Sequence, residues 1–119
     1  MMELAVGQTW VAKDVSSALL RIGRIEPFGE SIAVHVSLQC DTPAALVQKI
    51  GARLLIDHLP FDQQALRASL DQRSPVEFPA TAHFEEGYAQ WRKDNGGLFT
   101  TSVAQAIAYV SDVAFGTPR

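Results

Sequence analysis

The chain has 119 residues, of which 47% are hydrophobic and 19% charged, and its formal net charge at pH 7 is -3. This composition argues against intrinsic disorder and supplies enough apolar material for the core of one domain. A phosphate-binding surface needs clustered basic side chains, whereas here the arginines are scattered among acids. We therefore expect no nucleic acid among the partners.

Cys40 is the only cysteine, so no intramolecular disulfide and no paired-cysteine zinc or redox motif can form. The first residues lack a basic start followed by an apolar run, and no apolar stretch approaches the roughly 20 residues of a membrane helix. We expect a cytoplasmic protein that does not use a membrane as a partner.

The first half of the chain, residues 5–59, has a strand-like pattern. Apolar and polar residues alternate over residues 31–38, which predicts a half-buried antiparallel strand. A strand is also expected over residues 18–26, where Gly23 could form a bulge or a sharp bend. Proline and glycine in the segment between these strands predict a hairpin turn. Further strands are expected over residues 7–13 and 52–59.

The second half, residues 60–115, has mainly helical periodicity. Pro60 is expected to end the last strand, and Asp62 to cap a helix that continues to about residue 72. Two prolines within residues 74–80 predict an extended linker, because the residue before a proline avoids helical dihedral angles.

A second helix is expected from near Thr81 to the glycine pair at 96–97, which would stop it. Residues 98–100 could then return to the sheet as a short strand. Ser102 and Gln105 match an S-x-x-Q capping box and predict the start of a final helix. Together these elements predict one α+β domain over residues 1–119. Its sheet is expected to be a small, strongly coiled antiparallel sheet or an SH3-like partial barrel, covered by about three helices.

Three histidines are candidate metal ligands: His35, His58 and His83. They are far apart in sequence, and none belongs to an HxH or HExxH pair. His83 and Glu86 have the i, i+3 spacing that could face one metal, but a matching pair from another helix is missing. We therefore expect no metal and no cofactor.

Asp57 and His58 are neighbours and could form an acid–base pair. On a regular strand, however, neighbouring side chains point to opposite faces and do not touch. His58 alternates with Leu54 and Ile56, which favours a core or barrel-rim histidine. Cys40 lies on the apolar side of its predicted strand and is interpreted as a small buried hydrophobe. We expect no catalytic residue among them.

Phe84, Tyr88 and Trp91 follow one another at the spacing of one helical face. This pattern favours a stripe that faces the core. Tyrosine and tryptophan also carry polar groups that need a partner or a wet edge, so a ligand groove or a dimer contact stays an alternative.

Several short motifs, GQTW, HLPF and EGYAQW followed by GGLFT, resemble those of a family of small, uncharacterised bacterial proteins. The resemblance covers most of the chain and implies a single bacterial domain. It implies no activity, cofactor or catalytic residue.

The sequence favours a non-enzymatic module that binds another protein or itself, with a homodimer as the simplest form. One alternative is a small-molecule or enzymatic pocket between the sheet and the helices, and another is an immunity- or antitoxin-like inhibitor. The candidate ligand or partner surface consists of His58, Tyr88 and Trp91. A polar cavity beside these residues would favour the pocket.

Overall fold

The computed structural model describes residues 3–115, and within this range the side chains of residues 45 and 115 are not described. Five strands form one sheet in the order β4-β3-β2-β1-β5, and each strand is antiparallel to its neighbours. The strands are β1 (Thr9–Ala12), β2 (Leu19–Phe28), β3 (Ser31–Asp41), β4 (Arg53–Asp62) and β5 (Leu70–Arg73). The helices are the 3-10 helix η1 (Ala44–Leu46), α1 (Val47–Ile50), α2 (Gln63–Ser69), α3 (Phe84–Lys93) and α4 (Val103–Phe115).

The predicted α+β class and the antiparallel sheet are confirmed. The sheet is not closed into a barrel, because β4 and β5 form its two edges. Part of the β4 edge is covered by the segment after α3, as the sequence predicted. The backbone N–H of Phe99 donates to Pro60 O at 2.8 Å, and Asp62 N–H donates to Phe99 O at 2.9 Å.

Two predicted boundaries are wrong. Strand β4 continues through Pro60 to Asp62, because Pro60 lies on an edge strand where its missing N–H faces away from β3. Helix α2 ends at Ser69 rather than near residue 72, because Leu70 and the residues after it pair with β1. The predicted cap of α2 is confirmed, since the carboxylate of Asp62 accepts from two backbone N–H groups.

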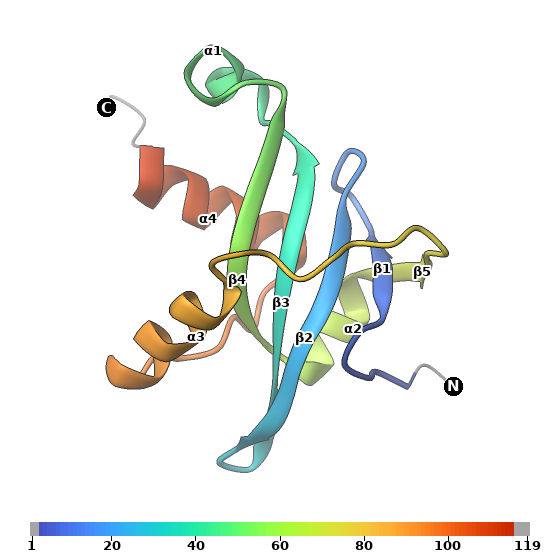
Figure 1. Cartoon of the computed structure of the whole chain (residues 1–119), viewed down its shortest axis with the longest axis vertical. Helices are drawn as coiled ribbons and strands as arrows, with labels where there is room; N and C mark the ends of the chain where they lie inside the picture. The colour runs from blue at the N-terminus through green and yellow to red at the C-terminus, as the bar shows by residue number, and fades with distance from the viewer. Residues whose placement is uncertain (1–2, 116–119) are drawn as a thin grey trace.

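The two faces of the sheet are covered differently. Helices α2 and α4 lie behind the sheet in Figure 1, whereas the extended linker of residues 74–83 crosses its front and α3 lies beside β4 on the front side. The rear face carries the apolar core, which includes Leu20, Leu38, Phe61, Leu66 and Ile107. The start of α4 is held to the end of α2 by a hydrogen bond from Val103 N–H to the Ser69 hydroxyl.

Two bulges change which side chains face the front. In β2 the pairing passes from Ile22 opposite Val36 to Arg24 opposite His35, so Gly23 is the extra residue and the predicted bulge is confirmed. In β4 two residues lie opposite the single Ser37, because the pairing passes from Ile56 to Leu59. Each bulge reverses the inward and outward alternation of its strand.

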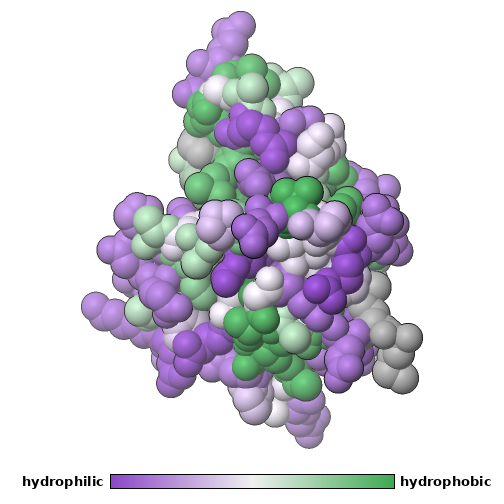
Figure 2. Space-filling view, turned by 45° about the vertical axis from the view of Figure 1, so that its right-hand side comes forward, coloured by the Kyte–Doolittle hydropathy of each residue, from purple (hydrophilic) through white to green (hydrophobic). Residues whose placement is uncertain are grey.

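None of the helices among residues 3–115 is long and apolar enough to cross a membrane. On the face drawn in Figure 2, apolar side chains gather in separate patches between polar ones.

Candidate functional site

Two glycines leave room for the packing of α3 against the front of the sheet. A β-carbon at Gly23 would lie 2.5 Å from Cζ of Phe84, and one at Gly87 would lie 2.7 Å from Cβ of His58. Phe84 and Tyr88 are buried and Trp91 is partly buried, so the predicted inward stripe of α3 is confirmed.

Beneath α3, one carboxylate and two imidazoles form a continuous chain across three strands. Glu26 Oε2 lies 2.8 Å from Nε2 of His35, and Nδ1 of His35 lies 2.8 Å from Nε2 of His58. The Glu26 oxygen is out of line with the Nε2–H bond direction, so this first contact is an electrostatic pair that falls short of a linear hydrogen bond. The two imidazole planes are 18° apart and the ring centroids 5.0 Å, so the rings meet edge to edge, as a hydrogen bond between ring nitrogens requires.

The carboxylate of Glu26 is the centre of a polar network. Its Oε1 accepts a hydrogen bond from the Tyr88 hydroxyl at 3.0 Å. The guanidinium groups of Arg24 and Arg92 each approach it to 3.8 Å. Arg24 also lies 4.2 Å from the centre of the Tyr88 ring. The negative charge therefore has a donor and two cations within reach, as a largely buried carboxylate requires.

Both imidazoles have lowered pKa values. His35 has no exposed surface, and its burial lowers its pKa, an effect that the negative charge of Glu26 opposes. Burial lowers the pKa of His58 to about 4, and the neighbouring His35 adds to this effect. His58 is therefore neutral at pH 7.

The structure brings together the three residues that the sequence singled out. The ring centroids of His58 and Tyr88 are 6.2 Å apart, and those of Tyr88 and Trp91 are 5.9 Å apart. His35 lies among them, 4.6 Å from Trp91. The expected alternation of His58 with Leu54 and Ile56 is wrong, because the bulge in β4 turns His58 to the front while the other two stay on the core side.

Sequence reasoning missed Glu26 altogether and considered His35 only as a metal ligand. A signal for the position of Glu26, and for that of His58, exists in the spacing of the core residues. In β2 the inward positions pass from Ile22 to Ile25, and in β4 from Ile56 to Leu59. A step of three instead of two marks a bulge, and it moves the even-numbered residues after it to the opposite face.

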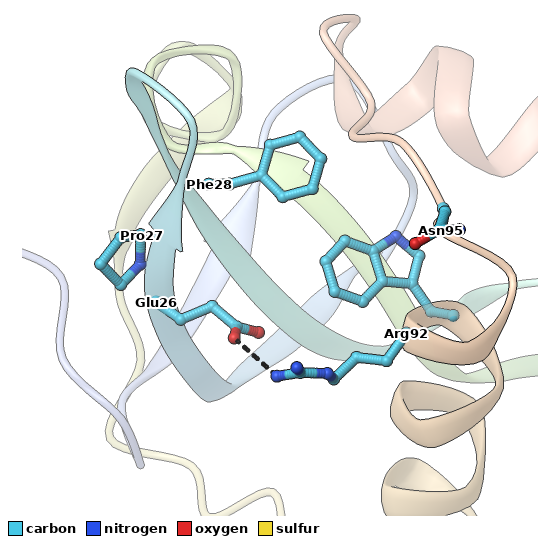
Figure 3. A pocket seen from close by; sticks show the side chains of 7 residues that line it. Glu26, Pro27, Phe28, Arg92 and Asn95 are labelled. Carbon is cyan, nitrogen blue, oxygen red and sulfur yellow. Dashed lines mark ion pairs between the residues drawn. The ribbon is translucent and has the colours of Figure 1, made fainter.

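A first cleft lies between the end of the β2–β3 hairpin and the C-terminal end of α3. We call it the hairpin cleft. Figure 3 shows the Glu26 side chain reaching from β2 toward Arg92 on α3, with Phe28 and Asn95 at the rim. The Phe28 and Trp91 rings are in contact, with centroids 5.7 Å apart. The cleft has a volume of about 330 Å³ and is lined by Glu26, Pro27, Phe28, Trp91, Arg92, Asn95 and Gly96.

A second, more open cleft lies on the opposite side of α3, and we call it the histidine cleft. It is lined by Ile56, Asp57, His58, His83, Glu86, Gly87, Ala89, Gln90 and Lys93. His83 contacts Glu86 here, with Nδ1 and Oε2 2.9 Å apart, and both side chains are exposed. Within residues 3–115, no three His, Cys, Asp or Glu side chains are grouped so that they could hold a metal ion.

Cys40 lies on the core face and is 1% exposed, as its apolar register predicted. Its burial raises the pKa of the thiol. A buried, protonated thiol away from both clefts does not contribute a nucleophile to them.

Comparisons with protein-family models, with curated proteins and with solved structures each found no match. The resemblance to a family of small bacterial proteins therefore stays a prediction. The chemistry of the site has to be inferred from its geometry.

Proposed function

We propose that the protein binds a small organic anion with an apolar body in the hairpin cleft. The observation that carries this proposal is the combination of two partly exposed aromatic rings with a guanidinium group at the wall of one cleft. Its volume of about 330 Å³ is at the lower end of the range of small-molecule sites.

The residues of the hairpin cleft offer two kinds of contact. Phe28 is 37% exposed and in contact with Trp91, so the pair presents an apolar surface to a ligand. The Arg92 side chain is 62% exposed, and the planar fork of donors on arginine matches a carboxylate or phosphate group. Its contacts with Glu26 and the Tyr88 hydroxyl hold the guanidinium in place.

The geometry of the two clefts favours the small-molecule hypothesis over the protein-binding one. The sequence alone favoured a protein-binding module, and it set a polar cavity beside His58, Tyr88 and Trp91 as the condition for a small-molecule site. Cavities lie on both sides of α3, one lined by Trp91 and the other by His58, whereas the buried Tyr88 lines neither. This supports the small-molecule hypothesis.

The proposal is tested by titrating the protein with benzoate and following backbone and indole N–H signals by NMR. We expect the largest shifts at the Trp91 indole, Asn95 and Gly96. Arg92→Met should weaken binding at least tenfold, because the anion loses its charged partner.

Arg73→Met is the matched control, because Arg73 also lies beside a tryptophan ring, that of Trp10, but outside the cleft. It should leave the benzoate affinity unchanged. Shifts scattered over the surface, or equal losses in both variants, would contradict the proposal.

Self-association is a second candidate, favoured by exposed apolar side chains on α4. Tyr109 is 62% exposed and Val113 is 68% exposed, and their spacing of four places them on one side of the helix. We expect a dimer in light-scattering measurements at high protein concentration, with its fraction reduced by Tyr109→Ser. A monomer at all concentrations would remove this candidate.

A further inference from the structure

The chain of Glu26, His35 and His58 has a cleft at each end. Glu26 lines the hairpin cleft, and His58 lines the histidine cleft on the other side of α3. His35 connects them and has no exposed surface. A ligand in the hairpin cleft alone does not explain why two imidazoles continue the chain to the second cleft.

The position of the protons in this chain follows from the chemistry of its members. A carboxylate oxygen 2.8 Å from Nε2 of His35 attracts an N–H group and repels a nitrogen lone pair, even though the contact is not a linear hydrogen bond, so Nε2 carries the proton of this imidazole. A neutral imidazole has one N–H, which leaves Nδ1 of His35 as an acceptor. Nε2 of His58, 2.8 Å from that atom, must then be the donor.

The outer nitrogen of His58 is therefore a bare acceptor. Its Nδ1 has no hydrogen-bond donor among residues 3–115, and it is not one of the polar atoms sealed from solvent. The cleft is also lined by the carboxylates of Asp57 and Glu86, the Lys93 ammonium and the His83 imidazole. The two carboxylates make the surroundings of the acceptor suitable for a group that donates hydrogen bonds.

We propose that the histidine cleft is a second binding site, for a small molecule that donates an ammonium or hydroxyl hydrogen to Nδ1 of His58, and that Glu26 fixes this acceptor state through His35. The carboxylate in one cleft thereby sets the hydrogen-bonding polarity of the other. This inference does not require a ligand in the hairpin cleft, so the two proposals can fail separately.

Glu26→Gln gives a direct test. The Tyr88 hydroxyl donates to Oε1 of Glu26 and Arg92 approaches the same oxygen, whereas only Arg24, at 3.8 Å, approaches Oε2. Because a donor lies within hydrogen-bond distance only at Oε1, we expect the amide oxygen of the variant side chain at that position and its NH₂ group facing His35. Nε2 of His35 must then accept and Nδ1 must donate, which makes Nε2 of His58 an acceptor. The proton of His58 moves to Nδ1, and the cleft changes from acceptor to donor.

The measurement is the ¹⁵N chemical shift of both ring nitrogens of His58 near neutral pH, which distinguishes a protonated from a bare nitrogen. We expect Nε2–H in the wild type and Nδ1–H in Glu26→Gln. Glu85→Gln, which changes the same charge on the exposed side of α3, is the matched control and should keep the wild-type pattern. A folded Glu26→Gln protein that retains Nε2–H would overturn the inference.

If Glu26→Gln does not fold, the His58 tautomer in the wild type still tests the proposed chain. An Nδ1–H tautomer of His58 in the wild type would contradict the proposed chain. Methylammonium is the probe for the site itself: it should shift Nδ1 of His58 saturably in the wild type and in Glu85→Gln. Acetate, which has no donor, should not. Absence of a saturable methylammonium effect would remove the binding site.

Discussion

The two faces of the sheet bury different kinds of side chain. The rear face buries aliphatic and aromatic side chains under α2 and α4, and each square ångström of apolar surface removed from water contributes about 25 cal/mol to stability. The front face buries a carboxylate and two imidazoles under α3, and such groups cost free energy unless they are partnered. The apolar core behind the sheet is therefore the main source of stability, and the buried titratable groups lie in front of the sheet.

The largest expected effect tests the rear face. Phe61 is fully buried, and its ring centroid lies 5.6 Å from that of Phe99. Phe61→Ala should lower the free energy of unfolding by about 4 kcal/mol, measured by urea denaturation, because it removes apolar contacts and leaves a cavity. Leu55→Ala is the control on the same strand, where the side chain is 53% exposed, and it should cost far less. Equal losses would mean that the rear face is not the main source of stability.

A pH titration tests the front face. The pKa of His58 is about 4 in the folded protein and 6.5 as its ordinary value, so the unfolded chain binds more protons between these values. Stability should fall as the pH is lowered from about 6.5 to about 4, on the order of 2 to 3 kcal/mol from this residue. The lowered pKa of His35 acts in the same direction.

The measurement is urea denaturation at a series of pH values for the wild type, His58→Gln and His83→Gln. His58→Gln should flatten the profile in this window. His83→Gln, at the exposed start of α3, should keep the wild-type slope. A slope that survives in His58→Gln would assign the effect to other groups.

Gly23→Ala tests whether α3 needs its close packing on the front face. The new β-carbon would lie 2.5 Å from the Phe84 ring, so the helix must move outward. We expect a loss of about 2 kcal/mol, as is typical of overpacking. Gly97→Ala meets no atom within 4 Å and serves as the control. If thermal unfolding shows the same midpoint for both variants, the contact between Gly23 and Phe84 does not position α3.

The smallest expected effect concerns one hydroxyl group. Tyr88→Phe removes the hydrogen bond to Glu26 and should cost about 1 kcal/mol, because a largely buried carboxylate loses a donor. Tyr109→Phe makes the same change on the exposed side of α4 and should be close to neutral in denaturant unfolding. A neutral Tyr88→Phe would show that water or arginine replaces the hydroxyl.

Much of this arrangement could be predicted from local sequence patterns. The Asp62 cap, the Gly23 bulge and the capping box of Ser102 and Gln105 all depend on residues close together in the chain. The end of α2 at Ser69 could not, because β5 exists only by pairing with β1, about 60 residues earlier in the chain. Helical periodicity carries no information about such a distant partner.

The site was predictable only in part. Tyr88 and Trp91 were found because helical spacing places them on one face of α3. The chain of Glu26, His35 and His58 was missed because the contact of Glu26 with His35 depends on the bulge in β2, and the contact of His35 with His58 depends on the bulge in β4. To predict a contact among side chains of three strands, the register of β2 with β3 and that of β3 with β4 must both be known. Neither register can be read from the sequence of one strand alone.

The placement of α3 has a consequence for the order in which the molecule assembles. Strands β2, β3 and β4 follow one another along the chain, whereas α3 comes only after β5 and the linker. Neighbouring strands close the shorter loops and should pair first, which leaves the imidazoles in contact with water until the helix docks. Docking of α3 is then a dehydration step. Refolding at a pH just below 6.5 should release protons in a late phase, visible with a pH indicator in weakly buffered solution.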